Sequence, residues 1–400
     1  MTGSSFGLYV HVPFCSRKCP YCDFNTYAVS SVPEEEYVAA LLRELRYSSE
    51  STHFKGKRIH SIFWGGGTPS LFSERGIAQV VEKADELFGI VPDAEVTLEA
   101  NPAIAQGDRY AGYRAAGVNR ISLGAQSFSK QTLTLLGREH SPEQIASAVH
   151  AAISAGISNV SIDIIFGVPG QTIEDVKSDI VSAVSLPIKH LSPYSLTIEK
   201  GTPFFQRQER GLLIMPDEEL VAEMLEIIPL LLASRGYSRY EISNYAQSGF
   251  ESFHNRAYWE SKEYLGLGAG AHSYAINLEG CLGSRWSNCA LPADYMARTQ
   301  RGDAKAWSEE LRREMLQFEF FFLGLRKIEG VSLAEYTGRF GATARHCVEP
   351  VLTELIAEGF LVQNADTIRL SAKGILVADS VIERISIEAQ AEMDVAIVRD

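Results

Sequence analysis

The most restrictive feature of this sequence is a regular alternation of short apolar runs and longer amphipathic segments between residues 8 and 196. Such alternation is typical of a parallel β-sheet whose strands are joined by crossover helices. The predicted strands are 8–12, 60–64, 95–99, 120–124, 161–166 and 190–195, and the main predicted helices are 34–46, 74–88, 142–155 and 173–184. Six strand–helix units are two fewer than a closed (β/α)8 barrel contains. The sequence therefore predicts an α/β fold.

Polar or glycine-rich motifs follow five of these strands directly. The first strand leads into a cysteine cluster, the second into Gly-Gly-Gly-Thr-Pro at 65–69, and the third into Glu-Ala-Asn-Pro at 99–102. The fourth ends in Gly-Ala-Gln-Ser at 124–127, and the fifth contains Asp163 and ends in Gly-Val-Pro-Gly at 167–170. In barrel-type α/β folds the carboxyl ends of the strands form the working face. The unusual chemistry of this chain is therefore expected on that face.

The cysteine cluster is the most specific motif in the chain. Cys15, Cys19 and Cys22 are half of the six cysteines, and their spacing is Cys-x3-Cys-x2-Cys. Thiolates are soft ligands suited to iron–sulfur clusters or zinc. Three of them on one loop can bind three irons of a [4Fe-4S] cluster and leave the fourth iron open. The alternative is a structural zinc site with His11 or a distant fourth ligand, but such sites usually contain two cysteine pairs, and no second pair occurs here.

Composition and charge limit the class of protein and the cellular compartment that we expect. The net charge of -13 and the pI near 5.3 argue against a general nucleic-acid-binding protein. Clustered cysteines without a secretory signal indicate a reducing compartment, so a cytoplasmic protein is expected. No apolar run approaches the roughly 20 residues that cross a bilayer. Membrane contact is predicted to be peripheral at most.

The pattern changes after Thr202. A helix over 217–234 precedes a loop-rich region, 237–288, and the chain then reads as helix 309–323, short helix 332–336, helix 344–357 and a hairpin of 360–362 with 367–370. That order predicts a winged-helix-like α+β domain. DNA binding is disfavoured, because residues 305–373 hold nine Lys or Arg against ten Asp or Glu. The predicted division is 1–235 for the barrel, 236–304 for a linking region, 305–375 for the C-terminal domain and 376–400 for a tail.

The segment from Tyr9 to Phe24, Tyr-Val-His-Val-Pro-Phe-Cys-Ser-Arg-Lys-Cys-Pro-Tyr-Cys-Asp-Phe, resembles the radical-SAM signature of coproporphyrinogen dehydrogenases and their haem-chaperone (HemW-like) relatives. The resemblance extends from Tyr9 to about Leu370. It implies a partial (β/α)6 barrel with a small C-terminal domain. It also implies that the open iron chelates S-adenosylmethionine (SAM), which an injected electron can cleave to a 5'-deoxyadenosyl radical.

The same resemblance implies residues for the SAM pocket. Tyr9, Gly66 and Glu99 are expected to contact the SAM bound to the cluster. The expected contacts for a second molecule, or for the outer wall of the same pocket, are Gly67, Thr68, Gln126, Arg138 and Asp163. Glycines let backbone approach a ligand closely, although the triplet also fits a plain tight turn. Each polar residue alone fits a structural hydrogen bond at a strand end; their shared face favours a binding site.

Two details separate the subfamilies. The decarboxylating dehydrogenases carry a further cysteine two residues beyond the third ligand, whereas Cys22 is followed here by Asp23 and Phe24. His254-Asn-Arg-Ala-Tyr258-Trp259 resembles the HNxxYW motif of the haem-chaperone branch. His254 is thus a candidate axial ligand for haem iron, and Tyr258 and Trp259 are candidates to stack on the porphyrin. The alternative is a loop held by a histidine hydrogen bond and two packed aromatic rings.

The sequence thus predicts a radical-SAM haem chaperone that uses a [4Fe-4S] cluster and SAM. By resemblance the recipients are respiratory cytochromes or bacterioferritin-like proteins, and a homodimer is possible. One alternative is an enzyme, an oxygen-independent coproporphyrinogen III dehydrogenase; another is a cluster protein that only carries electrons. Cys281, Cys289 and Cys347 read as ordinary apolar or loop residues, and the alternative is that one of them supplies a thiolate to haem.

Overall fold

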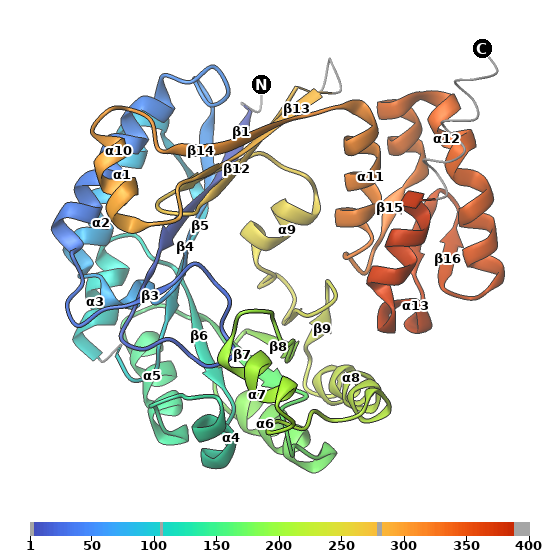
Figure 1. The fold of residues 1–400 in the computed structure, drawn as a ribbon, viewed down its shortest axis with the longest axis horizontal. Helices are drawn as coiled ribbons and strands as arrows, with labels where there is room; N and C mark the ends of the chain where they lie inside the picture. Colours follow the sequence, from blue (N-terminus) through green and yellow to red (C-terminus); the bar gives the residue numbers. More distant parts are fainter. Residues whose placement is uncertain (1–3, 105–106, 278–281, 388–400) are drawn as a thin grey trace.

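A large open sheet with its crossover helices on one face and a small C-terminal domain make up the molecule (Figure 1). The computed structural model describes residues 4–104, 107–277 and 282–387. Among the helices of these residues, none has both the length and the apolarity that crossing a bilayer requires.

Six consecutive parallel strands form the centre of the sheet and confirm the predicted α/β class. They lie side by side in chain order, each paired with the next. The strands are β1 (Ser5–Val12), β4 (Arg58–Gly66), β5 (Ile90–Ala100), β6 (Arg120–Gln126), β7 (Asn159–Phe166) and β8 (His190–Ser195). Each contains one of the six predicted strands.

Crossover helices cover the outer face of these strands. They are α1 (Glu34–Ser49), α2 (Glu74–Phe88), α3 (Gly107–Ala115), α4 (Lys130–Leu135), α5 (Pro142–Ser154) and α6 (Ile173–Ser185). Local capping sets where several of them begin. The Ser141 side chain caps α5 and Gln144 returns the bond, and Thr172 and Asp175 do the same for α6.

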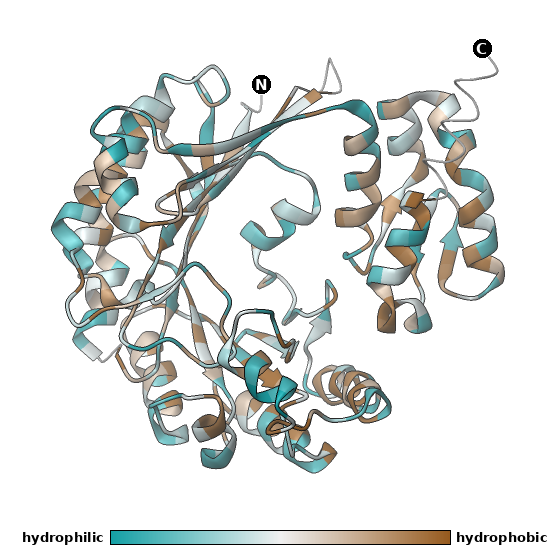
Figure 2. Cartoon of the chain, viewed as in Figure 1, coloured by the Kyte–Doolittle hydropathy of each residue, from teal (hydrophilic) through white to brown (hydrophobic). Residues whose placement is uncertain are grey.

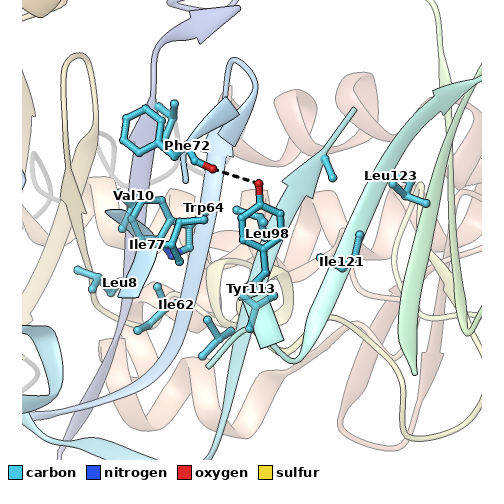
Figure 3. Packing of buried hydrophobic residues seen from close by; sticks show 14 of the residues in the cluster. Leu8, Val10, Ile62, Trp64, Phe72, Ile77, Leu98, Tyr113, Ile121 and Leu123 are labelled. Atoms are coloured by element: carbon cyan, nitrogen blue, oxygen red, sulfur yellow. Dashed lines mark hydrogen bonds between the residues drawn. The ribbon is translucent and has the colours of Figure 1, made fainter. Parts of the chain in front are cut away.

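The main core lies between the sheet and these helices. Alternate strand residues, among them Leu8 and Val10 in β1 and Ile62 and Trp64 in β4, point toward the helices and are fully buried (Figure 3). Tyr113 in α3 packs there and donates a hydrogen bond of 3.0 Å to the Phe72 carbonyl (Figure 3). Because side chains alternate along a strand, the intervening residues face the opposite side of the sheet. That side holds the site described below.

Further strands extend the sheet at both edges. β11 (Tyr264–Leu267) pairs parallel with β1, and β12 (His272–Asn277), β13 (Leu282–Asn288) and β14 (Lys305–Leu311) follow as antiparallel strands. β10 (Tyr245–Ala246) and β9 (Ser238–Arg239) extend the other edge. The described sheet runs from β14 to β9 without closing. The region expected to be rich in loops therefore supplies strands, and the helix expected from 309 begins only at 313 because β14 occupies 305–311.

Four helices lie outside the crossover set. α7 (Pro203–Glu209) and α8 (Glu218–Ala233) follow β8, α9 (Phe253–Trp259) precedes β11, and α10 (Pro292–Thr299) lies between β13 and β14. α8 corresponds to the helix predicted over 217–234. α9 lies on the side of the sheet opposite α1 and α2 (Figure 1).

The C-terminal domain has its own core. Its elements are α11 (Arg313–Gly324), β15 (Val331–Ser332), α12 (Leu333–Ala357), β16 (Leu361–Asn364), β17 (Thr367–Leu370) and α13 (Ala372–Leu376). α12 breaks at Gly341, whose φ of 82° interrupts the helix, and so contains both helices that the sequence predicts there. Val381, Ile382 and Ile385 also pack into this core. The order helix, strand, two helices and hairpin is that of a winged-helix-like fold.

Candidate functional site

A cavity of about 500 Å³ opens at the carboxyl ends of the parallel strands. Ten of the eleven side chains or glycines expected around the cluster and SAM line it. They are Cys15, Cys19, Cys22, Gly66, Gly67, Thr68, Glu99, Gln126, Arg138 and Asp163. Parallel strands end at the same edge of a sheet, so residues up to 148 positions apart meet there.

The cysteines lie on the loop that leaves β1. β2 (Phe14–Cys15) and β3 (Tyr27–Ala28) pair with each other and hold the two ends of this loop together. All three cysteines are free and partly exposed. Thr68 Oγ1 lies 3.5 Å from Cys15 Sγ, and Arg138 Nη1 lies 3.6 Å from Cys19 Sγ, both as donors. Donors aimed at sulfur favour an anionic, metal-bound state of the thiol.

Burial raises the pKa of the Cys15 thiol and of the Cys22 thiol. In the part of the chain that the structure describes, no three His, Cys, Asp or Glu side chains form a group that could bind a single metal ion. A [4Fe-4S] cluster makes a different demand, because each cysteine binds a different iron. Three free thiols facing one cavity, with donors to their sulfurs, are a ligand set that fits such a cluster.

The triple-glycine loop is tied to the cysteine loop by backbone hydrogen bonds. Gly67 N donates to the Val12 carbonyl at 2.8 Å, and Thr68 N donates to the Phe14 carbonyl at 2.8 Å. A Cβ on Gly67 would lie 2.6 Å from the Phe14 carbonyl oxygen. The turn therefore requires glycine at 67 because two backbone segments approach closely, in addition to any contact with a ligand.

Two carboxyl groups share the cavity. Gly66 N donates to Glu99 Oε2 at 3.2 Å, and Ser122 Oγ donates to Asp163 Oδ1 at 3.2 Å. Burial, reinforced by the neighbouring Asp163, raises the pKa of Glu99 to about 8. Burial raises the pKa of Asp163 to about 6, although hydrogen bonds and nearby arginines oppose the shift. Both groups can therefore exchange protons near neutral pH, and both present oxygens that accept hydrogen bonds from hydroxyl or amino groups.

The end of β6 carries backbone strain next to the cavity. Gln126 has a φ of 67°, which is rare for a residue other than glycine. Arg138 Nη2 donates to the Gly124 carbonyl at 2.8 Å and so holds the guanidinium beside this strand end. Strained backbone of this kind is concentrated at binding sites, where the surrounding structure maintains it.

Tyr9 is the expected SAM contact that does not line the cavity. Its hydroxyl lies 3.0 Å from Nδ1 of His11, and its ring stacks on Phe63, which does line the cavity. Tyr9 is thus placed one residue behind the wall.

Several lining residues received no predicted role from the sequence, including Tyr21, Asn101, Ser192 and Tyr194. The most notable is Arg120, which is 2% exposed and whose Nε has no hydrogen-bond partner among the described residues. Its nearest ion pair is to Glu95 Oε2 at 3.9 Å. A signal for it existed, because Arg120, Ser122, Gly124 and Gln126 are spaced by two along β6 and all line the cavity.

The HNxxYW motif forms α9 and its cap. His254 is 1% exposed; its Nδ1 lies 2.8 Å from Ser61 Oγ and its Nε2 lies 2.9 Å from the Tyr258 hydroxyl. Burial lowers the pKa of His254 to about 3, so the ring is neutral. Both ring nitrogens are engaged within the protein, and ligation of haem iron by His254 would require one of these contacts to break.

The other motif residues face different surroundings. Asn255 lines the cavity, and Tyr258 lines a separate groove beside the C-terminal domain. The guanidinium of Arg326 lies 5.7 Å over the Trp259 ring, so that tryptophan contacts the C-terminal domain. Haem contacts by His254, Tyr258 and Trp259 therefore remain predictions.

A second glycine-rich loop, residues 266–270, and two of the other cysteines lie away from the cavity. A Cβ on Gly266 would meet the His272 carbonyl at 2.0 Å, and one on Gly268 would meet the His11 carbonyl at 2.5 Å. This glycine loop therefore approaches backbone closely and does not line the cavity. Cys289 and Cys347 are buried, and Cys281 lies outside the described residues.

Sequence comparison identifies relatives along nearly the whole chain. The radical SAM superfamily matches residues 9–182, and the HemN C-terminal domain matches residues 311–377. The heme chaperone HemW of Mycobacterium tuberculosis is 36% identical over 96% of this chain and 95% of that protein. The heme chaperone HemW of Escherichia coli K12 is 35% identical over 94% of this chain and 97% of that protein.

Structural comparison shows a shared fold. The coproporphyrinogen III oxidase HemN from Escherichia coli, a radical SAM enzyme, superimposes with a TM-score of 0.81. The match covers 97% of this chain and 90% of that one at 22% identity. At this identity the similarity applies to the fold alone.

Proposed function

Because this chain belongs to the HemW family of heme chaperones within the radical SAM superfamily, we propose that it binds haem and delivers it to a haem-requiring protein. We propose further that it holds a [4Fe-4S] cluster and SAM in the cavity at the carboxyl ends of the strands. The observation that supports this most is the meeting of three free cysteines, the glycine loop and two carboxyl groups in one cavity.

In this proposal Cys15, Cys19 and Cys22 bind the cluster. Bound there with SAM, the cluster supplies one-electron chemistry. Thr68 and Arg138 donate hydrogen bonds to the ligand sulfurs and stabilise their negative charge.

Glu99 accepts hydrogen bonds from ribose hydroxyls, while the backbone at Gly66 and Gly67 passes close to the ligand. Gln126, Arg138 and Asp163 contact a second molecule or the outer part of the same one. Tyr9, one residue behind the wall, supports Phe63 on the cavity surface. This chain's own residues thus bind and orient the cofactor, and the buried carboxyl groups can gain or lose protons near neutral pH.

The finer parts of the proposal concern the cargo and its destination. His254, Tyr258 and Trp259 contribute to haem binding, as ligands or as supports for the residues that contact the ring. The recipients are respiratory cytochromes or bacterioferritin-like proteins, met in the cytoplasm or at a membrane surface. A homodimer is proposed for the state with the cluster bound.

One set of measurements tests the function. The full chain is reconstituted anaerobically with iron and sulfide, and EPR of the reduced cluster is recorded with and without SAM. Haem is titrated in parallel, and turnover of coproporphyrinogen III is assayed. The chaperone predicts an EPR change with SAM, a shifted Soret band, retained haem and no decarboxylation.

The other outcomes of these measurements would assign a different function to the chain. Formation of protoporphyrinogen would instead assign the chain as a dehydrogenase. An EPR spectrum unaffected by SAM, with no haem retained, would leave an electron carrier.

A further inference from the structure

A second, larger groove lies between α9 with its neighbouring strands and helix α11, and we call it the α9–α11 groove. Its volume is about 1190 Å³. The residues lining it come from three parts of the chain: Tyr258, Ser261, Lys262, Tyr264, Tyr274, Arg285, Arg312, Glu314, Met315, Phe318, Glu319, Phe322, Leu323, Ser386 and Ile387. Pockets of roughly 300–1,000 Å³ bury a drug-sized ligand, so this groove has room for a larger one.

Aromatic rings form both walls of the groove. On the sheet side Tyr264 and Tyr274 stack with centroids 6.1 Å apart, and Tyr258 meets Tyr264 edge-on at 4.6 Å. On the α11 side Phe318 and Phe322 lie 5.2 Å apart, and Phe318 remains 39% exposed. Figure 2 shows hydrophobic residues on the side of α11 turned toward α9. Two aromatic walls suit a flat, apolar ring system.

Cationic side chains accompany the aromatic walls. Lys262, Arg285 and Arg312 line the groove, against the two carboxylates Glu314 and Glu319. Arg285 already pairs with Glu309 and Glu319 at 2.8 Å, whereas Arg312 is exposed and makes no ion pair within the described residues. A bound molecule with carboxylate groups at its edge would therefore find a free guanidinium.

We propose that the α9–α11 groove is the haem site of this protein, an inference that rests on the proposed chaperone function. Haem combines a flat apolar macrocycle with two propionate groups at one edge, and the groove combines aromatic walls with cations. Met315 supplies a thioether to the lining, and thioethers are established ligands of haem iron. The ring lies between the tyrosines and α11, Arg312 pairs with a propionate, and Met315 faces the iron.

If haem binds in this groove, the HNxxYW motif has a role other than direct ligation of the haem iron. Tyr258 presents its ring to the groove, and the buried His254 holds the Tyr258 hydroxyl at 2.9 Å from its Nε2. His254 is then a positioning residue for the haem site. On the neighbouring turn Asn255 lines the cavity of the cluster, so one short helix separates the two cofactors.

The test uses the full chain with its cluster reconstituted and haem as the probe. Haem affinity is measured by titration of the Soret band for wild type, Phe318→Glu, Arg312→Glu and Met315→Leu. Leu230→Glu on α8 and Arg301→Glu are matched controls, because both positions are exposed and outside the groove. Circular dichroism and thermal melting establish that each variant is folded.

We expect Phe318→Glu and Arg312→Glu to weaken haem binding about tenfold or more, and both controls to bind like wild type. Met315→Leu should change the absorption bands of the bound haem, because it removes the sulfur and keeps the volume. Wild-type affinity in both charge variants would overturn the site. Unchanged bands in Met315→Leu would overturn Met315 as the ligand.

Two further results separate this inference from the proposed function. If wild type retains no haem, the chaperone proposal itself fails. If wild type binds haem normally, and Phe318→Glu leaves that binding intact but converts a dimer to a monomer by size-exclusion chromatography, the groove is an interface between copies and the haem site lies elsewhere.

Discussion

Asn255 and Tyr258 stand one turn apart on α9 and line two different hollows, the cavity at the strand ends and the α9–α11 groove. Residues three apart on a helix lie on neighbouring parts of its surface. A seven-residue helix is thus the partition between the proposed cluster and the proposed haem. The two proposed sites are therefore lined by residues only three positions apart on one helix.

Replacement of His254 tests whether this residue positions Tyr258 for the proposed haem site. His254→Ala removes the partner of the Tyr258 hydroxyl and empties a fully packed position, so we expect a loss of about 1–3 kcal/mol in stability. Haem should also bind more weakly, with unchanged absorption bands. Chemical denaturation and haem titration measure the two effects, and the exposed His346→Ala is the control. Altered haem bands at normal stability would instead identify His254 as an axial ligand.

The cluster assignment predicts a sharp division among the cysteines. Cys15→Ala, Cys19→Ala or Cys22→Ala each removes one thiolate ligand, and each should reduce iron and labile sulfide well below the wild-type content after anaerobic reconstitution. Cys289→Ala removes a buried thiol outside the loop and should retain the wild-type iron content. Stoichiometric zinc in the untreated wild-type protein, without labile sulfide, would contradict the assignment.

The close approach at Gly67 predicts a cost for a single methyl group. In Gly67→Ala the Cβ would meet the backbone oxygens of Phe14 and Val12 at 2.6 and 2.8 Å, so the two loops must separate. We expect a loss of about 1–3 kcal/mol, read from the midpoint of urea unfolding. Gly338→Ala is the matched control, since its Cβ meets nothing within 4 Å and lies in α12. That variant should be more stable by roughly 0.5–1 kcal/mol.

The raised pKa of Glu99 makes stability depend on pH. The folded protein keeps this proton up to about pH 8, whereas the unfolded chain releases it near 4.5. Between these values the folded state binds more protons, and stability from this group falls as pH rises. Glu99→Gln should therefore gain stability over wild type at pH 8 relative to pH 5, by at least about 1 kcal/mol, because one pKa unit corresponds to about 1.36 kcal/mol.

Urea midpoints of the protein without cofactors, taken at pH 5 and pH 8, measure this difference. Glu82→Gln on the exposed side of α2 should show none. An equal difference between wild type and Glu99→Gln at the two pH values would rule out the proposed titration.

The parallel strands were predictable because each joins an apolar run to an amphipathic helix. The edge strands were not. β11 is four residues long with Gly266 inside it, and its partner β1 lies about 250 positions away in the sequence. β14 is exposed along nearly its whole length, so it carries no alternation of apolar and polar residues. For this reason the sequence around Glu309 and Glu310 predicts the start of a helix instead of a strand.

The cavity was largely predictable, since its residues follow the strands directly. Arg120 was missed because it stands at the beginning of β6, and only the shared face of alternate residues brings it to the cavity. The α9–α11 groove was not predictable from the sequence, for a different reason. Tyr258, Arg285 and Phe318 reach it from a helix, a strand and a second domain, and no local pattern relates them.

The linker between the sheet and the C-terminal domain is very short. β14 ends at Leu311 and α11 begins at Arg313, so a single residue connects them. A longer linker would let the C-terminal domain move relative to the sheet, and the two aromatic walls of the α9–α11 groove could then separate freely. If the protein binds and releases haem as proposed, release would require movement of the sheet edge or of α9, because only one residue connects the two parts. That residue, Arg312, is also the proposed partner of a haem propionate.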